Sequence, residues 1–406
     1  MRFLICTVMV MLICQTVGGA DKRIGTPASP SKSDNGFAAR LYSAVAGAEN
    51  QNSFFSPASI ATALAMTSTG ARGETQRQML EVLGYKDADP ATLHAAFAEL
   101  IKSTNGDGGE RAFQLTMANR LWGQKGFHFL PQFLNQTQKD YGAGLEEVDF
   151  AHNLEAARQT INAWVEKQTA DKIKDLIKPG NLGPDSRLVL TNAIYFKGAW
   201  ADPFKKEMTK EEAFQLSSDQ KANVPMMHRN GRYHYAEDDA VQILELPYAG
   251  NEVSMVVILP HKADGLSQVE KSIDAKWLAD LPGRLKSRQV QVALPKFKME
   301  ARFELAKVLA SMGMPLAFGP KADFSGMSTE EKLVIDEVIH QAYVDVNEEG
   351  TEAAAATAVT MRALAVHNPE APVVFRADHP FTFLIRDTRS GAILFMGKVA
   401  NPTAAK

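Results

Sequence analysis

The sequence predicts an α+β fold with large β-sheets, and two observations carry that prediction. Helical patterns dominate the first half of the 406 residues, whereas long apolar, β-branched stretches dominate the second half. No internal repeat, low-complexity linker or change of composition separates the two halves. Helices followed by strands in this way are typical of an α+β architecture, so we expect residues 21–406 to form a single domain.

The first twenty residues have the pattern of a secretory signal peptide. One positive charge at Arg2 is followed by an uncharged, mainly apolar run from Phe3 to Cys14, and small residues precede Asp21. The run is too short to cross a lipid bilayer as a helix. We therefore expect residues 1–20 to be removed and the mature protein to be secreted and extracellular.

Composition argues against several classes of function. Both cysteines, Cys6 and Cys14, lie in the predicted signal peptide, so the mature chain offers no thiol for a disulfide, a zinc site or a cysteine nucleophile. A net charge of −3 gives no bulk attraction to nucleic acid or to an anionic membrane. The nine histidines are scattered, and the sequence carries no motif of a serine hydrolase, zinc protease or P-loop protein. We expect neither an enzyme nor a bound metal or cofactor.

The helices of the first half follow a loose lead at 21–35. Ser56 stands where a helix cap would precede Pro57 in the first turn, and small or apolar residues continue on all sides until Gly70. A helix that is apolar all round belongs in the interior. Further helical patterns cover 73–84, 91–103 and 153–169.

The second half has the pattern of strands and hairpins, because its runs are rich in β-branched residues and bounded by turn residues. We expect strands over 187–198, 289–299 and 332–349, two strands within 240–260 around a turn at Tyr248–Glu252, and a hairpin over 380–399.

The segment 351–358 is composed of Ala and Thr apart from one charge, Glu352. Alternate side chains of a strand point to opposite faces, so every second residue from Thr351 to Met361 would share one wholly uncharged face. Glu352 and Arg362 would share the other face, and neither Pro nor Gly interrupts the segment. Such a strand could enter a sheet without burying a charge. The alternatives are an Ala-rich helix or a spacer.

Five segments, in this order, resemble the serpin family over essentially the whole mature chain. They are NSFFSPASIATALAM (52–66), LTNAIYFKGAWADPF (190–204), ALPKFKME (293–300), VIHQAYVDVNEEGTEAAAATA (338–358) and DHPFTFLIRDTRSGAILFMGKVANP (378–402). The resemblance implies a serpin fold, in which these segments form a buried second helix, three strands and the hinge of one large sheet, and a C-terminal hairpin. It also implies an exposed reactive-centre loop, about residues 349–372, that a serine protease cleaves as bait. The freed loop would insert into the large sheet and trap the protease as an acyl-enzyme.

The resemblance assigns three groups of residues to the opening of that sheet. The hinge group is Glu348, Gly350, Thr351, Glu352, Ala353, Ala354, Ala355, Ala356, Thr357 and Ala358. The breach group, at the top of the sheet, is Trp200, Lys296 and Glu348, and the shutter group, beneath the opening, is Ser56, Ser59, Asn192 and His340. Lys296 and Glu348 are expected to form an ion pair, with a solvated surface pair as the alternative. His340 is expected to exchange hydrogen bonds as the strands part, which is compatible with an ordinary satisfied core histidine.

The resemblance also places the bait bond. Counted from Glu348 as the first, the seventeenth residue is Leu364, so we expect cleavage between Leu364 and Ala365. A Leu at this position favours chymotrypsin-like enzymes, cathepsin G or elastase-like enzymes among secreted serine proteases. The alternative is cleavage between Arg362 and Ala363 by a trypsin-like enzyme, whose pocket requires a cation. Some serpins are carriers or chaperones instead, and that non-inhibitory role is the remaining alternative.

Two surface sites complete the predictions. Asn135 begins an Asn-Gln-Thr triplet, an acceptor for glycosylation in a secreted chain. A basic group is a secondary candidate for binding heparin-like glycosaminoglycans, with a solvated charged face as the alternative. This group comprises Lys276, Arg284, Lys286 and Arg288. We expect a monomer.

Overall fold

The computed structural model describes residues 30–47, 50–105, 112–142, 144–330, 332–351 and 371–404. Its helices are α1 Pro30–Val45, α2 Pro57–Ser68, α3 Gly73–Leu83, α4 Pro90–Asn105, α5 Pro131–Tyr141, α6 Leu154–Gln168, α7 Leu266–Ser272, α8 Ala275–Arg284 and α9 Ala306–Met312, with short 3-10 turns η1 Lys206–Met208 and η2 Pro315–Phe318. Its strands are β1 Ser53–Phe55, β2 Phe113–Gln124, β3 Leu145–Val148, β4 Leu188–Ala199, β5 Lys210–Gln215, β6 Lys221–Glu237, β7 Val241–Pro247, β8 Val253–Pro260, β9 Lys286–Pro295, β10 Phe297–Glu304, β11 Glu337–Val346, β12 Gly350–Thr351, β13 Val373–Arg376, β14 Phe381–Asp387 and β15 Ile393–Val399. The predicted α+β class is confirmed.

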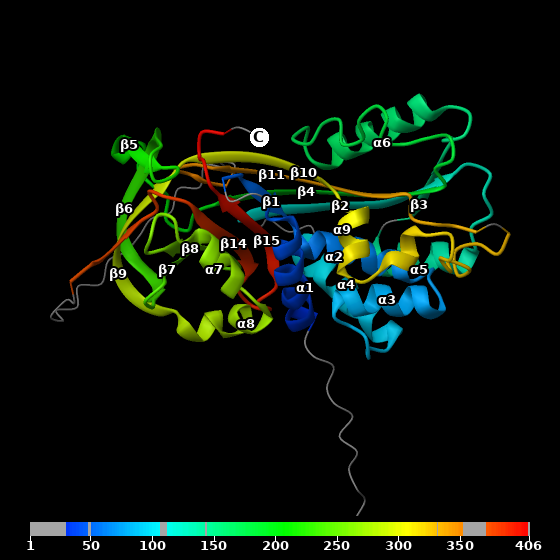
Figure 1. Ribbon diagram of the computed structural model, residues 1–406, viewed down its shortest axis with the longest axis horizontal. Coiled ribbons are helices and arrows are strands. Elements are labelled where there is room, and N and C mark those ends of the chain that lie inside the picture. The colour runs from blue at the N-terminus through cyan, green and yellow to red at the C-terminus, as the bar shows by residue number, and fades with distance from the viewer. Residues whose placement is uncertain are drawn as a thin grey trace, which may run out of the picture.

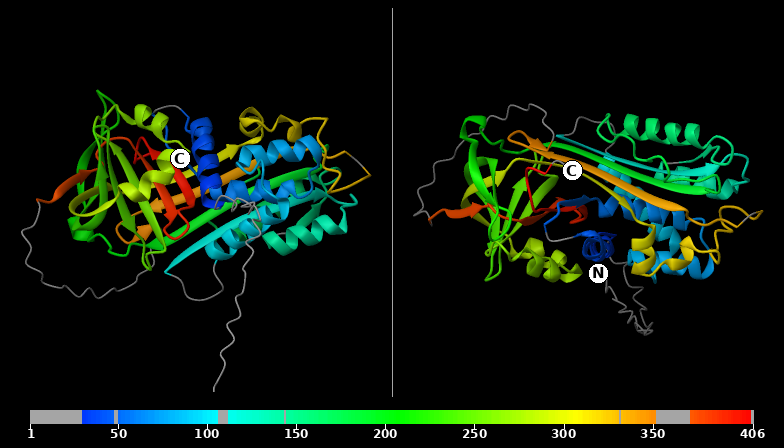
Figure 2. Two further views of the ribbon diagram at one scale, coloured as in Figure 1. Left: turned by 90° about the horizontal axis from the view of Figure 1, so that it is seen from below. Right: turned by 45° about the horizontal axis from the view of Figure 1, so that its top comes forward.

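The described strands form two sheets. The six-stranded sheet has the order β10-β11-β12-β4-β2-β3, and the nine-stranded sheet has the order β1-β15-β14-β8-β7-β6-β9-β13 with β5 paired to β6. The six-stranded sheet crosses the middle of the molecule, with α6 on one face and α2, α4 and α5 on the other (Figure 1). The nine-stranded sheet lies at one end, next to α7 and α8, as the turned views also show (Figure 2). In the described ranges, no helix is long and apolar enough to cross a membrane.

Helix α2 is interior, as its sequence predicts. The side chain of Ser56 caps the helix by accepting a hydrogen bond from the Ser59 N–H at 3.1 Å, and Pro57 occupies the first turn. Every residue from Pro57 to Ser68 is buried. Beyond the helix, a Cβ at Gly70 would lie 2.1 Å from a side-chain carbon of Met327, so only glycine fits there.

Strand β4 is buried over almost its whole length because both faces of the six-stranded sheet are covered. On one face, Ile194 and Phe196 join the main core, which also contains α2. On the other face, Ala193 and Tyr195 join a second core under α6, to which Ile161 contributes. The two faces of β4 therefore pack against different parts of the molecule.

The structure corrects several expectations drawn from the sequence. The loose lead expected over 21–35 is too long, because α1 begins at Pro30. The segment 293–300 does not lie in one sheet: it leaves the nine-stranded sheet at Pro295 and enters the six-stranded sheet at Phe297. The strand expected over 332–349 is limited to β11. Strand β2 was missed, since its mixed burial pattern shows no clear alternation.

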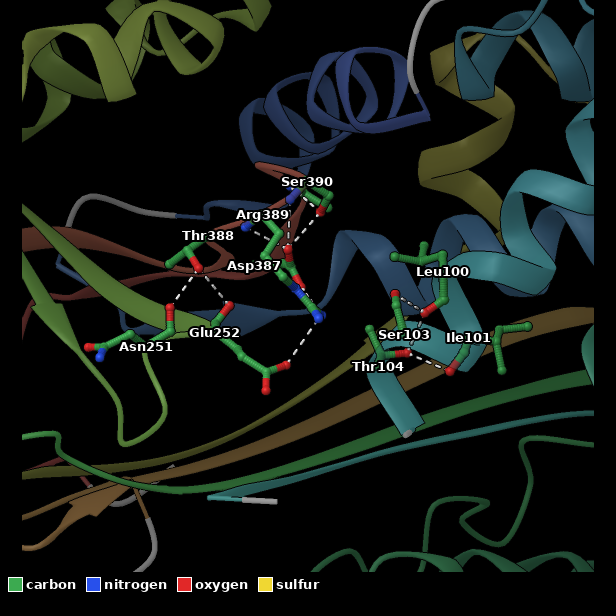
Figure 3. Close-up of polar contacts among 11 residues, drawn as sticks. Leu100, Ile101, Ser103, Thr104, Asn251, Glu252, Asp387, Thr388, Arg389 and Ser390 are labelled. Carbon is green, nitrogen blue, oxygen red and sulfur yellow. Dashed lines mark hydrogen bonds and ion pairs between the residues drawn. The ribbon is translucent and has the colours of Figure 1, made fainter. Parts of the chain in front are cut away.

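The turn between β14 and β15 fixes the neighbouring turn between β7 and β8 (Figure 3). The Asp387 carboxylate accepts hydrogen bonds from the backbone N–H groups of Arg389 at 2.9 Å and Ser390 at 2.8 Å. The Thr388 hydroxyl donates to the backbone carbonyls of Asn251 at 2.7 Å and Glu252 at 3.0 Å. The C-terminal hairpin thus holds the residues that follow β7 in place.

Candidate functional site

Strand β12 enters the six-stranded sheet as a short wedge between two central strands. Thr351 pairs antiparallel with Val346 of β11 on one side and with Gly198 of β4 on the other. Farther along the sheet, β11 and β4 pair directly with each other in parallel over Glu337–Tyr343. The start of the hinge group is therefore already part of the sheet, and the strands beyond it are still closed.

Gly350 allows the chain to turn into the sheet at this point. Its φ is +152°, in the region that favours glycine. A Cβ there would lie 2.1 Å from the carbonyl oxygen of Gly198 and 2.7 Å from the Cα of Ala199. Any larger residue would push β12 away from β4.

The breach residues meet where β12 begins. Lys296 Nζ lies 2.9 Å from Oε2 of the buried Glu348, and the Thr209 hydroxyl donates to Glu348 Oε1 at 2.8 Å. Burial alone would raise the pKa of Glu348, but the hydrogen bonds from Lys296 and Thr209 outweigh it and hold the pKa below its ordinary value. The indole N–H of Trp200 donates to the carbonyl of Asn347 at 2.9 Å. These contacts fix the chain just before Gly350.

The structure adds Tyr248, which sequence reasoning had treated only as a turn residue. Its hydroxyl lies 2.6 Å from Oγ1 of Thr351, and both side chains are fully buried. Burial raises the pKa of this phenol, so it stays neutral and can donate. The contact depends on Gly198, where a Cβ would lie 3.0 Å from the ring.

A row of three polar side chains crosses the closed part of the sheet. Asn119 of β2 lies opposite Asn192 of β4, which in turn lies opposite His340 of β11. Asn192 Nδ2 donates to Asn119 Oδ1, and Asn192 Oδ1 bonds to His340 Nδ1. The family resemblance implies Asn192 and His340 but not Asn119, because only the strand register shows that Asn119 completes the row.

Helix α2 and its capping residue Ser56 supply the remaining partners of this row. The Ser56 N–H donates to His340 Nε2 at 3.1 Å, and Asn192 Nδ2 donates to the Ser59 hydroxyl at 2.7 Å. The Ser59 hydroxyl donates to Asn119 Oδ1 at 3.1 Å. The structure thus brings all four predicted shutter residues together in one buried network.

His340 is neutral in this network. Its Nε2 accepts from a backbone N–H, so the ring proton must lie on Nδ1, where the acceptor is Asn192 Oδ1. A second proton would face the Ser56 N–H. Burial lowers the pKa of His340 to about 3, in agreement with this geometry.

Several predicted residues lie outside the described residues. These are the two candidate bait bonds, Leu364–Ala365 and Arg362–Ala363, and the hinge positions Glu352, Ala353, Ala354, Ala355, Ala356, Thr357 and Ala358. The same holds for the predicted signal peptide at 1–20.

The two surface predictions fall on described residues. Asn135 is exposed on α5, whereas Thr137 of the same triplet is buried and donates to the carbonyl of Phe133 at 3.1 Å. In the basic group, Lys276 is paired with Asp280 at 2.5 Å. Arg284 is likewise paired with an acidic side chain, Asp238, at 2.5 Å. Two of the four cations are therefore locally neutralised, which weakens the group as an anion-binding surface.

Comparison with known proteins identifies the family. The family model described as Serpin (serine protease inhibitor) matches residues 32–402. An uncharacterised serpin-like protein of Thermococcus kodakarensis is 43% identical over 368 residues, covering 91% of this chain and 84% of that protein. Human leukocyte elastase inhibitor is 42% identical over 360 residues, covering 86% and 93%. Human thyroxine-binding globulin, solved with thyroxine, is 32% identical with a TM-score of 0.84, covering 92% of this chain and 99% of that one. The chain therefore belongs to the serpin family.

Proposed function

We propose that this serpin is a suicide inhibitor of serine proteases that traps its target by inserting the cleaved loop between β4 and β11. One observation carries the proposal. Thr351 is already paired with both of these strands, and the two strands are paired with each other just beyond it. If β12 lengthened during insertion, it would separate β4 from β11 at the residues where these two strands now pair.

The strand register supports this path. If β12 continued antiparallel from Thr351, residue 354 would lie opposite Tyr195 of β4 and also opposite Tyr343 of β11. Tyr195 and Tyr343 are at present each other's partners. In the same hypothetical register, Thr357 would lie between Asn192 and His340. Its hydroxyl would replace the hydrogen bond that these two residues lose when the strands separate.

The side-chain pattern supports the same path. Thr351 faces the main core, where it meets Tyr248. By alternation, the uncharged Ala353, Ala355 and Thr357 would follow it on that face. Glu352 would instead face the α6 side, between Lys197 of β4 and Asp345 of β11, both of which are only partly buried. Insertion would therefore bury no unpaired charge.

For the target, we propose chymotrypsin-like or elastase-like proteases that cleave between Leu364 and Ala365. The similarity to leukocyte elastase inhibitor supports a protease that accepts an uncharged residue at the bait position. The alternative is a trypsin-like enzyme that cleaves after Arg362. That cut would shorten the inserted strand by two residues, and we expect it to produce more substrate-like turnover.

The experiment is incubation with one chymotrypsin-like and one trypsin-like protease, followed by denaturing electrophoresis and mass spectrometry. We expect a covalent complex that survives denaturation and a released fragment that begins at Ala365. A fragment that begins at Ala363 would move the bait to Arg362. Cleavage without any covalent complex would overturn the inhibitory function.

A carrier role is the second candidate, because thyroxine-binding globulin, whose name describes binding of thyroxine, shares this fold. Thermal unfolding before and after loop cleavage separates the two roles. An inhibitor of the proposed kind gains stability when its loop is cut. Unchanged stability, together with saturable binding of a small apolar ligand, would favour the carrier.

We further propose that residues 1–20 direct secretion and that Asn135 carries a glycan. The exposure of Asn135 leaves room for a sugar, but the burial of Thr137 requires the glycan to be attached before α5 folds. Mass spectrometry of protein secreted by a eukaryotic host tests both points. A mature N-terminus other than Asp21, or an unmodified Asn135, would contradict them.

A further inference from the structure

We infer that Tyr248 is a positioning residue for loop insertion, because its hydroxyl holds Thr351 in the sheet before any protease arrives. This inference rests on the proposed function, in which insertion starts at β12. Tyr248 is the first residue after β7, and its hydroxyl lies 2.6 Å from Oγ1 of Thr351. Both side chains have zero exposure, so water does not compete for either group.

The ring of Tyr248 is fixed independently of the hinge. It stacks on Trp200 with ring centres 4.6 Å apart and planes 13° apart, and it meets Phe196 edge-on at 5.0 Å. Its backbone N–H donates to Val253 at 3.0 Å. The turn that follows is held by the C-terminal hairpin (Figure 3). The tyrosine is therefore the fixed partner, and Thr351 is the one that can leave.

The sheet is shaped to allow this contact. Gly198 lies opposite Thr351 on β4, and a Cβ there would lie 2.8 Å from the Phe196 ring and 3.0 Å from the Tyr248 ring. A side chain at this position would displace the phenol from under β12. The absence of a side chain at Gly198 thus lets a tyrosine from the other sheet reach the hinge.

The two hydroxyls depend on each other. Among the described residues, the Tyr248 hydroxyl has no other hydrogen-bond partner, and the same is true of the Thr351 hydroxyl. Removing one of two buried partners leaves the other unsatisfied, which is costly, whereas removing both leaves a dry apolar contact. Expelling Thr351 from the sheet would likewise leave Tyr248 unsatisfied. The hydrogen bond therefore favours the state in which the first step of insertion is complete.

The consequence concerns the competition that follows cleavage. The acyl-enzyme either hydrolyses and releases the protease, or the loop inserts and traps it. A hinge that is already seated does not have to part β4 and β11 again at the top of the sheet, so insertion starts sooner. Losing the bond should raise the partition ratio, the number of substrate turnovers per trapped protease. It should not slow recognition of the bait.

A double-mutant cycle tests the inference. We expect Tyr248→Phe and Thr351→Val each to raise the partition ratio about tenfold, which corresponds to about 1.4 kcal/mol. The double variant should show about the same rise as either single variant, because each single change already removes the same hydrogen bond. Thr351→Ser keeps the hydroxyl and should behave as the wild type. Tyr235→Phe removes another buried tyrosine hydroxyl, which donates to Glu237 at 2.6 Å, and should leave the partition ratio unchanged.

The readouts are titration of inhibitor against a protease that the wild type traps, the rate constant for loop cleavage and the thermal midpoint of each variant. Additive effects of the two single changes, or single variants with the wild-type partition ratio, would overturn the inference. An equal fall in the rate of cleavage would also overturn it, because the tyrosine would then act on recognition. If the wild type itself forms no covalent complex, the proposed function fails before the cycle begins.

Discussion

Replacing His340 with glutamine should reduce the dependence of stability on pH. His340 is fully buried and neutral, and it joins β11 to β4 and α2 through its two ring nitrogens. Glutamine can also donate and accept a hydrogen bond, but it cannot take up a proton near neutral pH. The variant therefore removes the titration and keeps a polar side chain in the row.

The magnitude follows from the pKa of His340, which is about 3 in the folded protein against 6.5 for an ordinary histidine. Between these values the unfolded chain binds a proton that the folded chain does not, so stability falls as the pH falls. The stability that depends on a neutral His340 is fully present above pH 6.5 and is lost progressively as the pH falls toward 3. Each pH unit below 6.5 lowers the free energy of unfolding by about 1.4 kcal/mol. At pH 4.5 the free energy of unfolding is therefore about 2.7 kcal/mol lower than at neutral pH.

The assay is urea unfolding followed by tryptophan fluorescence at pH 7.5 and pH 4.5. At pH 7.5 we expect His340→Gln to be less stable by about 1–3 kcal/mol, because its hydrogen bonds are less well placed. At pH 4.5 the two proteins should have nearly equal stability. Parallel losses in wild type and variant between the two pH values would refute the assignment of a neutral, buried His340.

Two further predictions concern the start of β12. Lys296→Met should lower the free energy of unfolding by about 1–3 kcal/mol, since it removes the cation that faces the buried carboxylate of Glu348. Urea titration measures this change, and Lys210→Met on the exposed edge of β5 is the control. Equal stability of both variants would show that the ion pair is only a solvated contact. Gly350→Ala should dislodge β12, because its Cβ would lie 2.1 Å from a carbonyl oxygen of β4, and faster amide exchange in β12 would report the change. The control is Gly283→Ala, where the new Cβ would have open space around it, and it should leave amide exchange in β12 unchanged. Unchanged exchange in Gly350→Ala would contradict the prediction.

Some parts of the molecule could be predicted from the sequence or from the family resemblance. The interior position of α2 could be predicted because its residues are apolar or small on every side and Ser56 caps it. The meeting of Lys296 with Glu348 could be expected from the family resemblance, and the structure places their charged atoms 2.9 Å apart. The residues of α2 carry their own signal, whereas the ion pair is implied only by the resemblance.

The residues that sequence reasoning missed act through strand pairing. Asn119 belongs to the shutter network only because β2 and β4 align it with Asn192. Tyr248 reaches Thr351 from the neighbouring sheet only because Gly198 leaves space between them. Neither relation is visible in the order of residues along the chain, since both depend on the register of strands that are distant in sequence.

The central claim is that the segment after Thr351 becomes a strand between β4 and β11 once the loop is cut. Amide hydrogen exchange of the protein before and after cleavage within 352–370, combined with the thermal midpoint of both forms, measures this directly. The account predicts that amides of 352–360 become strongly protected after the cut and that the nicked protein unfolds at a clearly higher temperature. Fast exchange in that segment and an unchanged midpoint would contradict it.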